Sequence, residues 1–193
     1  SINLGSINLV PSSFDDILIG EIDTNLAVKW AKLITAFGAS DSKHTTQTKN
    51  MDYINGSLYL SGMMKGGFAP YGEEEARIAS KSTPLNGFVI KCDASNGEWL
   101  GGVSADEQGI GGYFGVAKGK ENNLYAYGYS WATPNKGICL TTIDESSWEK
   151  TEKIALITET GMGTAWSCLA DGTNFYSFSR GNKAVNFYNS EFT

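Results

Sequence analysis

The sequence predicts an all-β protein built from repeated units of four antiparallel strands, as in a β-propeller. A polar turn followed by a short aromatic strand occurs three times, and an apolar strand that ends in Asp recurs between these copies. Glycine (23 residues) and aromatic residues (12%) are frequent and proline (4 residues) is rare, which suits many short strands joined by tight turns. Such self-similarity indicates units that bury their apolar faces by stacking on one another.

The aromatic motif predicts the second strand of each unit. In its first copy Asn55-Gly56 is the strongest two-residue signal for a hairpin, and this explains the Asn-Gly-Ser run without invoking a glycosylation site. The copies are Asn55–Gly62, Asn122–Gly128 and Gly172–Ser179, with strands expected over 57–63, 123–129 and 174–179. The first strands of the units are expected just before them, over 46–54, 112–118 and 164–170.

The Asp-terminated motif predicts the third strand, because Asp favours the turn that follows. A Trp-bearing fourth strand is expected next. Asp93 precedes Tyr125 and Asp144 precedes Tyr176 by the same distance of 32 residues, which supports one register. The third strands are Asp16–Asp23, Gly87–Asp93, Gly137–Asp144 and a weaker Lys183–Asn189. The fourth strands are 26–34 with Trp30, 98–103 with Trp99, and 153–158 led by Trp148.

This reading gives two whole units and two partial ones within a single domain over 1–193. Unit boundaries are expected near 37, 105 and 160, with an insertion over 64–86, and residues 6–10 are a candidate second strand for the first unit. A propeller closes into a ring of four to eight blades. We therefore expect an incomplete ring, completed by a protein partner or by further blades of the same polypeptide. The alternative fold is a β-sandwich.

The order of these motifs resembles the bacterial β-propeller repeats of the SBBP type. The matching stretches are Trp30 with Phe37–Asp41, and Trp99 with Gly101–Asp106, each followed by the Asn-x-Leu-Tyr type of strand. The resemblance covers nearly the whole chain and concerns structural residues alone. It implies a propeller fold and an extracellular or cell-surface location.

Catalytic and metal-binding chemistry is sparse in this sequence. His44 is the only histidine, so a His-based triad or metal cluster would have to use it. The three cysteines, Cys92, Cys139 and Cys168, lack the spacing of a metal site and are expected to be small buried hydrophobic residues. We expect no metal and no cofactor.

The charge pattern and the hydropathy pattern exclude two further classes of partner. The net charge is −6 and the 15 Lys and Arg residues are scattered, which disfavours nucleic-acid binding. No apolar run is long enough for a transmembrane helix, so no membrane insertion is expected.

Topology predicts where a ligand would bind. In four-stranded antiparallel units the loops between units and the loops between second and third strands lie on one face, and loops on a rigid scaffold often carry binding residues. Tyr71 and Trp131 are the candidate anchors. The full set on this face is Asp41, His44, Tyr71, Arg77, Asp106, Glu107 and Trp131. The sequence favours a non-enzymatic binding or scaffold module, with a carbohydrate-active hydrolase or lyase and a lectin-like glycan-binding propeller as alternatives.

Overall fold

The computed structural model describes most of the chain and has an all-β architecture. It covers 1–12, 16–38, 47–79, 85–105, 110–119, 121–130, 137–159, 164–170, 175–180 and 185–187, and it describes side chains as far as 150. Every strand pairing in these residues is antiparallel. The prediction of an all-β fold is therefore confirmed.

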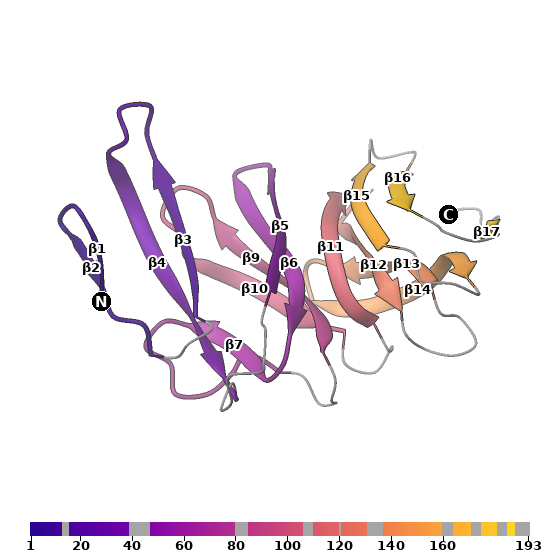
Figure 1. Cartoon of the computed structure of the whole chain (residues 1–193), viewed down its shortest axis with the longest axis horizontal. Helices are drawn as coiled ribbons and strands as arrows, with labels where there is room; N and C mark the ends of the chain where they lie inside the picture. Colours follow the sequence, from indigo (N-terminus) through magenta and orange to yellow (C-terminus); the bar gives the residue numbers. More distant parts are fainter. Residues whose placement is uncertain are drawn as a thin grey trace.

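The two units that the sequence predicts as complete form two neighbouring sheets (Figure 1). Each is a meander in which consecutive strands of the unit pair in order. The second sheet contains β5 (Gln47–Ile54), β6 (Ser57–Met64), β9 (Asn86–Asp93) and β10 (Trp99–Ser104). The third sheet contains β11 (Ile110–Lys118), β12 (Asn123–Ser130), β13 (Gly137–Asp144) and β14 (Glu149–Glu159).

The first sheet contains a third and a fourth strand of the repeat, extended by strands from the insertion. The insertion supplies two short strands that pair next to β4, and its Phe68 is fully buried with Ile78 nearly so. Apolar residues of the insertion thus gain burial by extending a sheet. The strands, in spatial order, are β3 (Ile17–Ile22), β4 (Val28–Phe37), β7 (Gly67–Pro70) and β8 (Ile78–Ala79).

Two predicted strands pair differently from expectation. Residues 6–10 are a candidate second strand of the first unit, but β2 (Ile7–Leu9) forms a separate hairpin with β1 (Ile2–Leu4), because a two-residue turn joins the two strands directly. The weak copy at 183–189 was expected beside the second strand of its own unit. Its short β17 (Val185–Phe187) pairs instead with the open edge of β14, which offers unpaired backbone groups.

The fourth unit is represented by a two-stranded sheet of β15 (Thr164–Ala170) and β16 (Phe175–Arg180). Its β15 lies against β11 and β12 of the third sheet. The N-terminal hairpin of β1 and β2 and the hairpin of β15 and β16 lie at opposite ends of the row of sheets (Figure 1). The sheets of the described residues form an open row.

A recurring β-bulge supports the repeat at the level of the backbone. Between the first and second strands, the register shifts at Thr48/Asn50, at Tyr113/Gly115 and at Ala165/Ser167. In each hairpin the shift lies opposite the residues two and three positions after the tyrosine of the aromatic motif. Since a bulge adds one residue and increases local twist, all three hairpins bend alike.

The core lies between neighbouring sheets. One cluster joins the first and second sheets, with Phe68 and Phe88 packed edge to face at 5.0 Å between ring centroids. A second cluster joins the second and third sheets around Tyr113. Cys92 and Cys139 are buried in these clusters, as predicted, and burial raises the pKa of the Cys92 thiol to about 12.

The three tryptophans of the repeat do not occupy equivalent positions. Trp30 pairs with Glu21 on β3, Trp99 begins its strand, and Trp148 lies in the turn before β14 with a positive φ of 61°. Two of them instead cover glycines of the second unit, one in β10 and one in the connection that precedes it. The Trp148 ring lies on Gly101, where an added Cβ would be 2.0 Å from the indole Nε1, and Trp30 covers Gly97 in the same way.

Replacing Gly101 by Ala is expected to destabilise the protein by about 2 kcal/mol, because the new methyl group would push Trp148 out of its packed position. Urea unfolding followed by circular dichroism measures the loss. Leu100→Ala, at the exposed neighbouring residue, is the control and is expected to change stability little. Equal losses for the two variants would contradict the packing argument.

Candidate functional site

Two of the Asp-terminated strands, β9 and β13, end in the same side-chain-stabilised turn. Asp93 Oδ1 accepts hydrogen bonds from the backbone N and the Oγ of Ser95, at 2.7 and 2.6 Å. Asp144 does the same with Ser146, at 2.8 and 2.6 Å. These hydrogen bonds lower the pKa of both carboxyl groups. The turn at Asp144 projects the next residue, Glu145, toward the second sheet.

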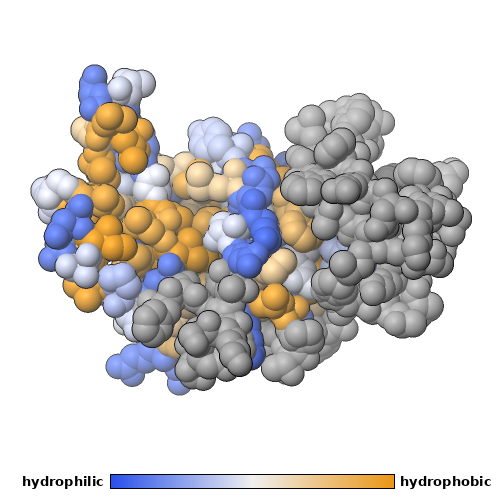
Figure 2. All heavy atoms as spheres, in the orientation of Figure 1, coloured by the Kyte–Doolittle hydropathy of each residue, from blue (hydrophilic) through white to orange (hydrophobic). Residues whose placement is uncertain are grey.

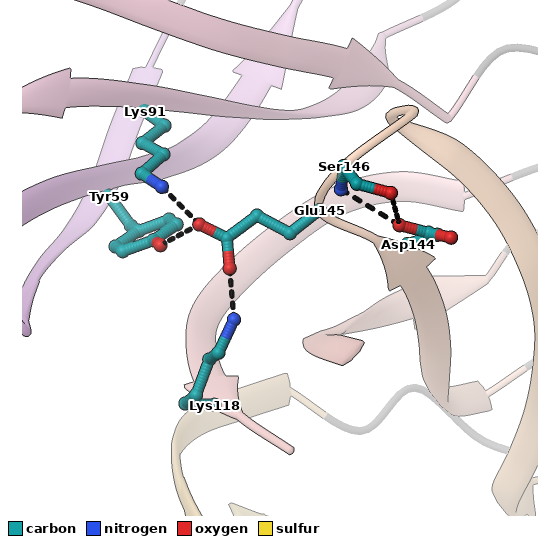
Figure 3. Close-up of polar contacts among 6 residues, drawn as sticks. All are labelled: Tyr59, Lys91, Lys118, Asp144, Glu145 and Ser146. Atoms are coloured by element: carbon teal, nitrogen blue, oxygen red, sulfur yellow. Dashed lines mark hydrogen bonds and ion pairs between the residues drawn. The ribbon is translucent and has the colours of Figure 1, made fainter. Parts of the chain in front are cut away.

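Glu145 is the centre of a polar cluster that joins the second and third sheets (Figure 3). Its Oε1 accepts a hydrogen bond of 2.5 Å from the Tyr59 hydroxyl and pairs with the Lys91 ammonium. Its Oε2 pairs with the Lys118 ammonium. Lys91 also lies over the Tyr59 ring, 5.6 Å from the centroid. Tyr59 and Lys91 come from the second sheet, and Glu145 and Lys118 from the third.

The electrostatics of this cluster keep Glu145 ionised. Its side chain is 11% exposed, and burial alone would raise its pKa. The hydrogen bonds from Lys118, Lys91 and Tyr59 outweigh that burial and lower the pKa of Glu145 to about 2. Burial, with the hydrogen bond to Glu145, raises the pKa of the Tyr59 hydroxyl. Glu145 thus has no proton to donate near neutral pH, and its oxygens are occupied by ammonium and phenol donors.

The Glu145 cluster is therefore suited to holding two sheets together and poorly suited to acid–base catalysis. A second contact of this kind lies nearby, where Asp52 of β5 accepts a hydrogen bond of 2.9 Å from the Val116 backbone N of β11. Sequence reasoning missed Glu145. The repeat itself held the signal, because the residues after the other two turn aspartates are Thr24 and Ala94, which makes Glu145 a departure from the repeat.

Two of the predicted binding residues, Tyr71 and Arg77, lie in the described part of the chain, and both line the same surface hollow. Arg77 forms an ion pair with Glu73, and the Tyr71 hydroxyl donates a 3.0 Å hydrogen bond to the Val10 carbonyl oxygen. The hollow has a volume of about 400 Å³, and Trp99 also lines it. Its other lining residues are Leu9, Lys32, Leu33, Ile34, Pro70, Cys92, Gly97 and Glu98.

The other five predicted binding residues lie outside the described residues: Asp41, His44, Asp106, Glu107 and Trp131. Within the part of the chain that the structure describes, no group of three His, Cys, Asp or Glu side chains is placed to hold a metal ion. The same residues include no helix long and apolar enough to cross a membrane.

No family model matches the chain, and no curated protein matches it.

Replacing Glu145 by Gln is expected to lower stability by about 3 kcal/mol, because it leaves Lys91 and Lys118 without their shared counter-charge. Because the pKa of Glu145 is lowered, its contribution to the free energy of unfolding depends on pH. This contribution is complete above the ordinary Glu pKa of 4.5 and is lost as the pH falls toward about 2. Chemical denaturation from pH 7 to pH 2 should show the difference between wild type and variant shrinking over that range.

Glu21→Gln is the matched control, since it breaks the exposed ion pair of Glu21 with Lys29. Solvent screens such a pair, so its loss should be much smaller than that of Glu145→Gln. A Glu145→Gln loss that stays constant down to pH 2 would contradict the assignment of an ionised, paired Glu145.

Proposed function

We propose that this chain is a non-enzymatic scaffold module, a segment of a β-propeller of the SBBP type that binds further β-sheets at its open end. One observation carries the proposal. Leu18 and Ile22 point outward from the first sheet and are 43% and 60% exposed. Figure 2 places apolar side chains over this part of the molecule.

The equivalent residues of the second and third sheets are buried, so the exposure of Leu18 and Ile22 departs from the repeat. Counted back from the turn aspartate, Leu18 and Ile22 correspond to Phe88 and Cys92 in the second sheet, and those two residues are fully buried against the first sheet. The corresponding residues of the third sheet, Cys139 and Ile143, are fully buried against the second. On this face β4 is buried at Leu33, which pairs with Leu18, whereas β3 has the residue pattern of a stacked sheet and leaves Leu18 and Ile22 exposed.

The Glu145 cluster also supports a scaffold rather than an enzyme. Its charges are paired with one another across two sheets, and Glu145 holds no exchangeable proton near neutral pH. Rigid attachment of sheet to sheet is the property that a stacking module requires.

The mass of the native particle tests this proposal. Light scattering, combined with intact mass spectrometry of the component chains, is expected to find a particle larger than one chain of 20.8 kDa. Leu18→Lys should shift it toward single chains, because a charge on the stacking face opposes its burial. A stable particle of one wild-type chain would overturn the proposal.

A glycan-binding role is a second candidate, supported by the hollow that Tyr71 and Trp99 share with the Arg77–Glu73 pair. Aromatic rings beside charged hydrogen-bonding groups are suited to sugar recognition. Binding should quench tryptophan fluorescence, and Tyr71→Ala should weaken it at least tenfold with no effect from Tyr53→Ala outside the hollow. A glycan array without signal above background would contradict this role.

A further inference from the structure

The repeat is interrupted at both ends of the row of sheets in a complementary way. In the first sheet, β3 is the third strand of a unit and pairs with β4 alone among the described strands. In the other units the second strand of the unit occupies that edge, as β6 does beside β9 and β12 does beside β13. The open edge of β3 thus lacks a second strand.

At the other end, β15 and β16 are the first and second strands of a unit. Among the described strands, β16 pairs with β15 alone. The segment expected to follow it, β17, pairs with β14 instead. The open edge of β16 thus lacks a third strand, which is the kind of strand that β3 provides.

The space beside β3 also lacks the side chains that a complete sheet would place there. A hollow of about 380 Å³ lies between Gly20 and Glu21 of β3 and Met51 and Tyr53 of β5. Met51 and Tyr53 are 55% and 70% exposed.

The corresponding position in the third sheet shows what should cover Met51. Met51 pairs with the residue after Tyr59, and Val116 pairs with the residue after Tyr125, so the two are equivalent. Val116 is 3% exposed because the complete second sheet packs on it. A hairpin of first and second strands beside β3 would bury Met51 in the same way.

We propose that a second copy of this chain fills this place, its β15–β16 hairpin pairing with β3 while its own β3 receives the hairpin of the first copy. This inference rests on the proposed stacking function and names the partner. The register of β6 with β9, transferred to the new pair, aligns all six residues of β16 with all six of β3. It places Ser179 opposite Leu18 and Phe175 opposite Ile22, as Gly62 lies opposite Phe88 and Leu58 opposite Cys92.

The number of sheets favours two copies over closure of one chain on itself. Each copy contributes its second and third sheets and the two halves of one more. Counted over the described sheets alone, two copies give six, within the four to eight of closed propellers, whereas one copy closing on itself gives three. The β3 and β16 strands of a single chain also lie at opposite ends of the row (Figure 1). In the paired ring, the exposed Leu18 and Ile22 would pack against the third sheet of the second copy.

Disulfide cross-linking of a Leu18→Cys/Ser179→Cys variant tests the partner and the register together. Directly paired residues bring Cα atoms within the 4.4–6.8 Å that a disulfide needs. Mild oxidation with diamide is expected to give a covalent dimer that reduction returns to single chains. Leu18→Cys/Ser177→Cys is the control for register, because its diagonal pair lies about 7–8 Å apart and should cross-link far less. The native Cys92 reacts slowly, since burial raises its thiol pKa.

The outcomes separate this inference from the proposed function. A disulfide within one chain would show self-closure and overturn the second copy. A particle larger than one chain without this cross-link would overturn the strand pairing and leave the stacking proposal standing, with another protein as the occupant. A single-chain particle without the cross-link would contradict both.

A charge placed at the proposed interface gives an independent test. Ile22→Lys should weaken the dimer by about tenfold or more, because a large apolar side chain that becomes buried on pairing is replaced by an ammonium. Leu100→Lys, on the outer strand β10 at 47% exposure, should leave the dimer unchanged. Sedimentation equilibrium measures both, and equal effects would overturn the assigned interface. Unchanged circular dichroism of both variants confirms folding.

Discussion

Stacking of sheet on sheet is the constraint on which the rest of this structure depends. Successive side chains of a strand point to opposite faces, so a sheet between two others needs apolar residues on both. β9 meets this need: Phe88 and Ile90 pack toward the first sheet, and Val89 packs toward the third. All three residues are fully buried. The same apolar composition in β3, at the end of the row, leaves one face in solvent.

Specific contacts add spacing and alignment to this general attraction. Apolar burial is non-directional. In contrast, an indole ring packed on a glycine, or a carboxylate paired with two ammonium groups, requires one distance between the two sheets that supply the groups. Trp148 on Gly101 and Glu145 between Lys91 and Lys118 both join the second and third sheets. Together they fix the position of the third sheet on the second. Neither contact involves the outer face of the first sheet.

Sequence periodicity predicted the strands well and the lateral partners of irregular segments poorly. The second strands and the Asp turns lie where the motifs place them, because turn chemistry and alternation are local properties. The insertion lacks the repeat pattern, and the segment at 183–189 carries only a weak copy of it. Their strands pair with whichever open edge the assembled sheets present, β4 in one case and β14 in the other.

The sequence by itself determined the repeat, the order of strands within a unit and the burial of residues such as Cys92 and Cys139. All of these follow from spacing along the chain. Only the tertiary structure decided that Glu145 meets Tyr59 and Lys91, that Trp30, Trp99 and Trp148 serve different positions, and which strand edges stay open. Those features depend on contacts between residues far apart in the chain, and their geometry exists only after the sheets have packed.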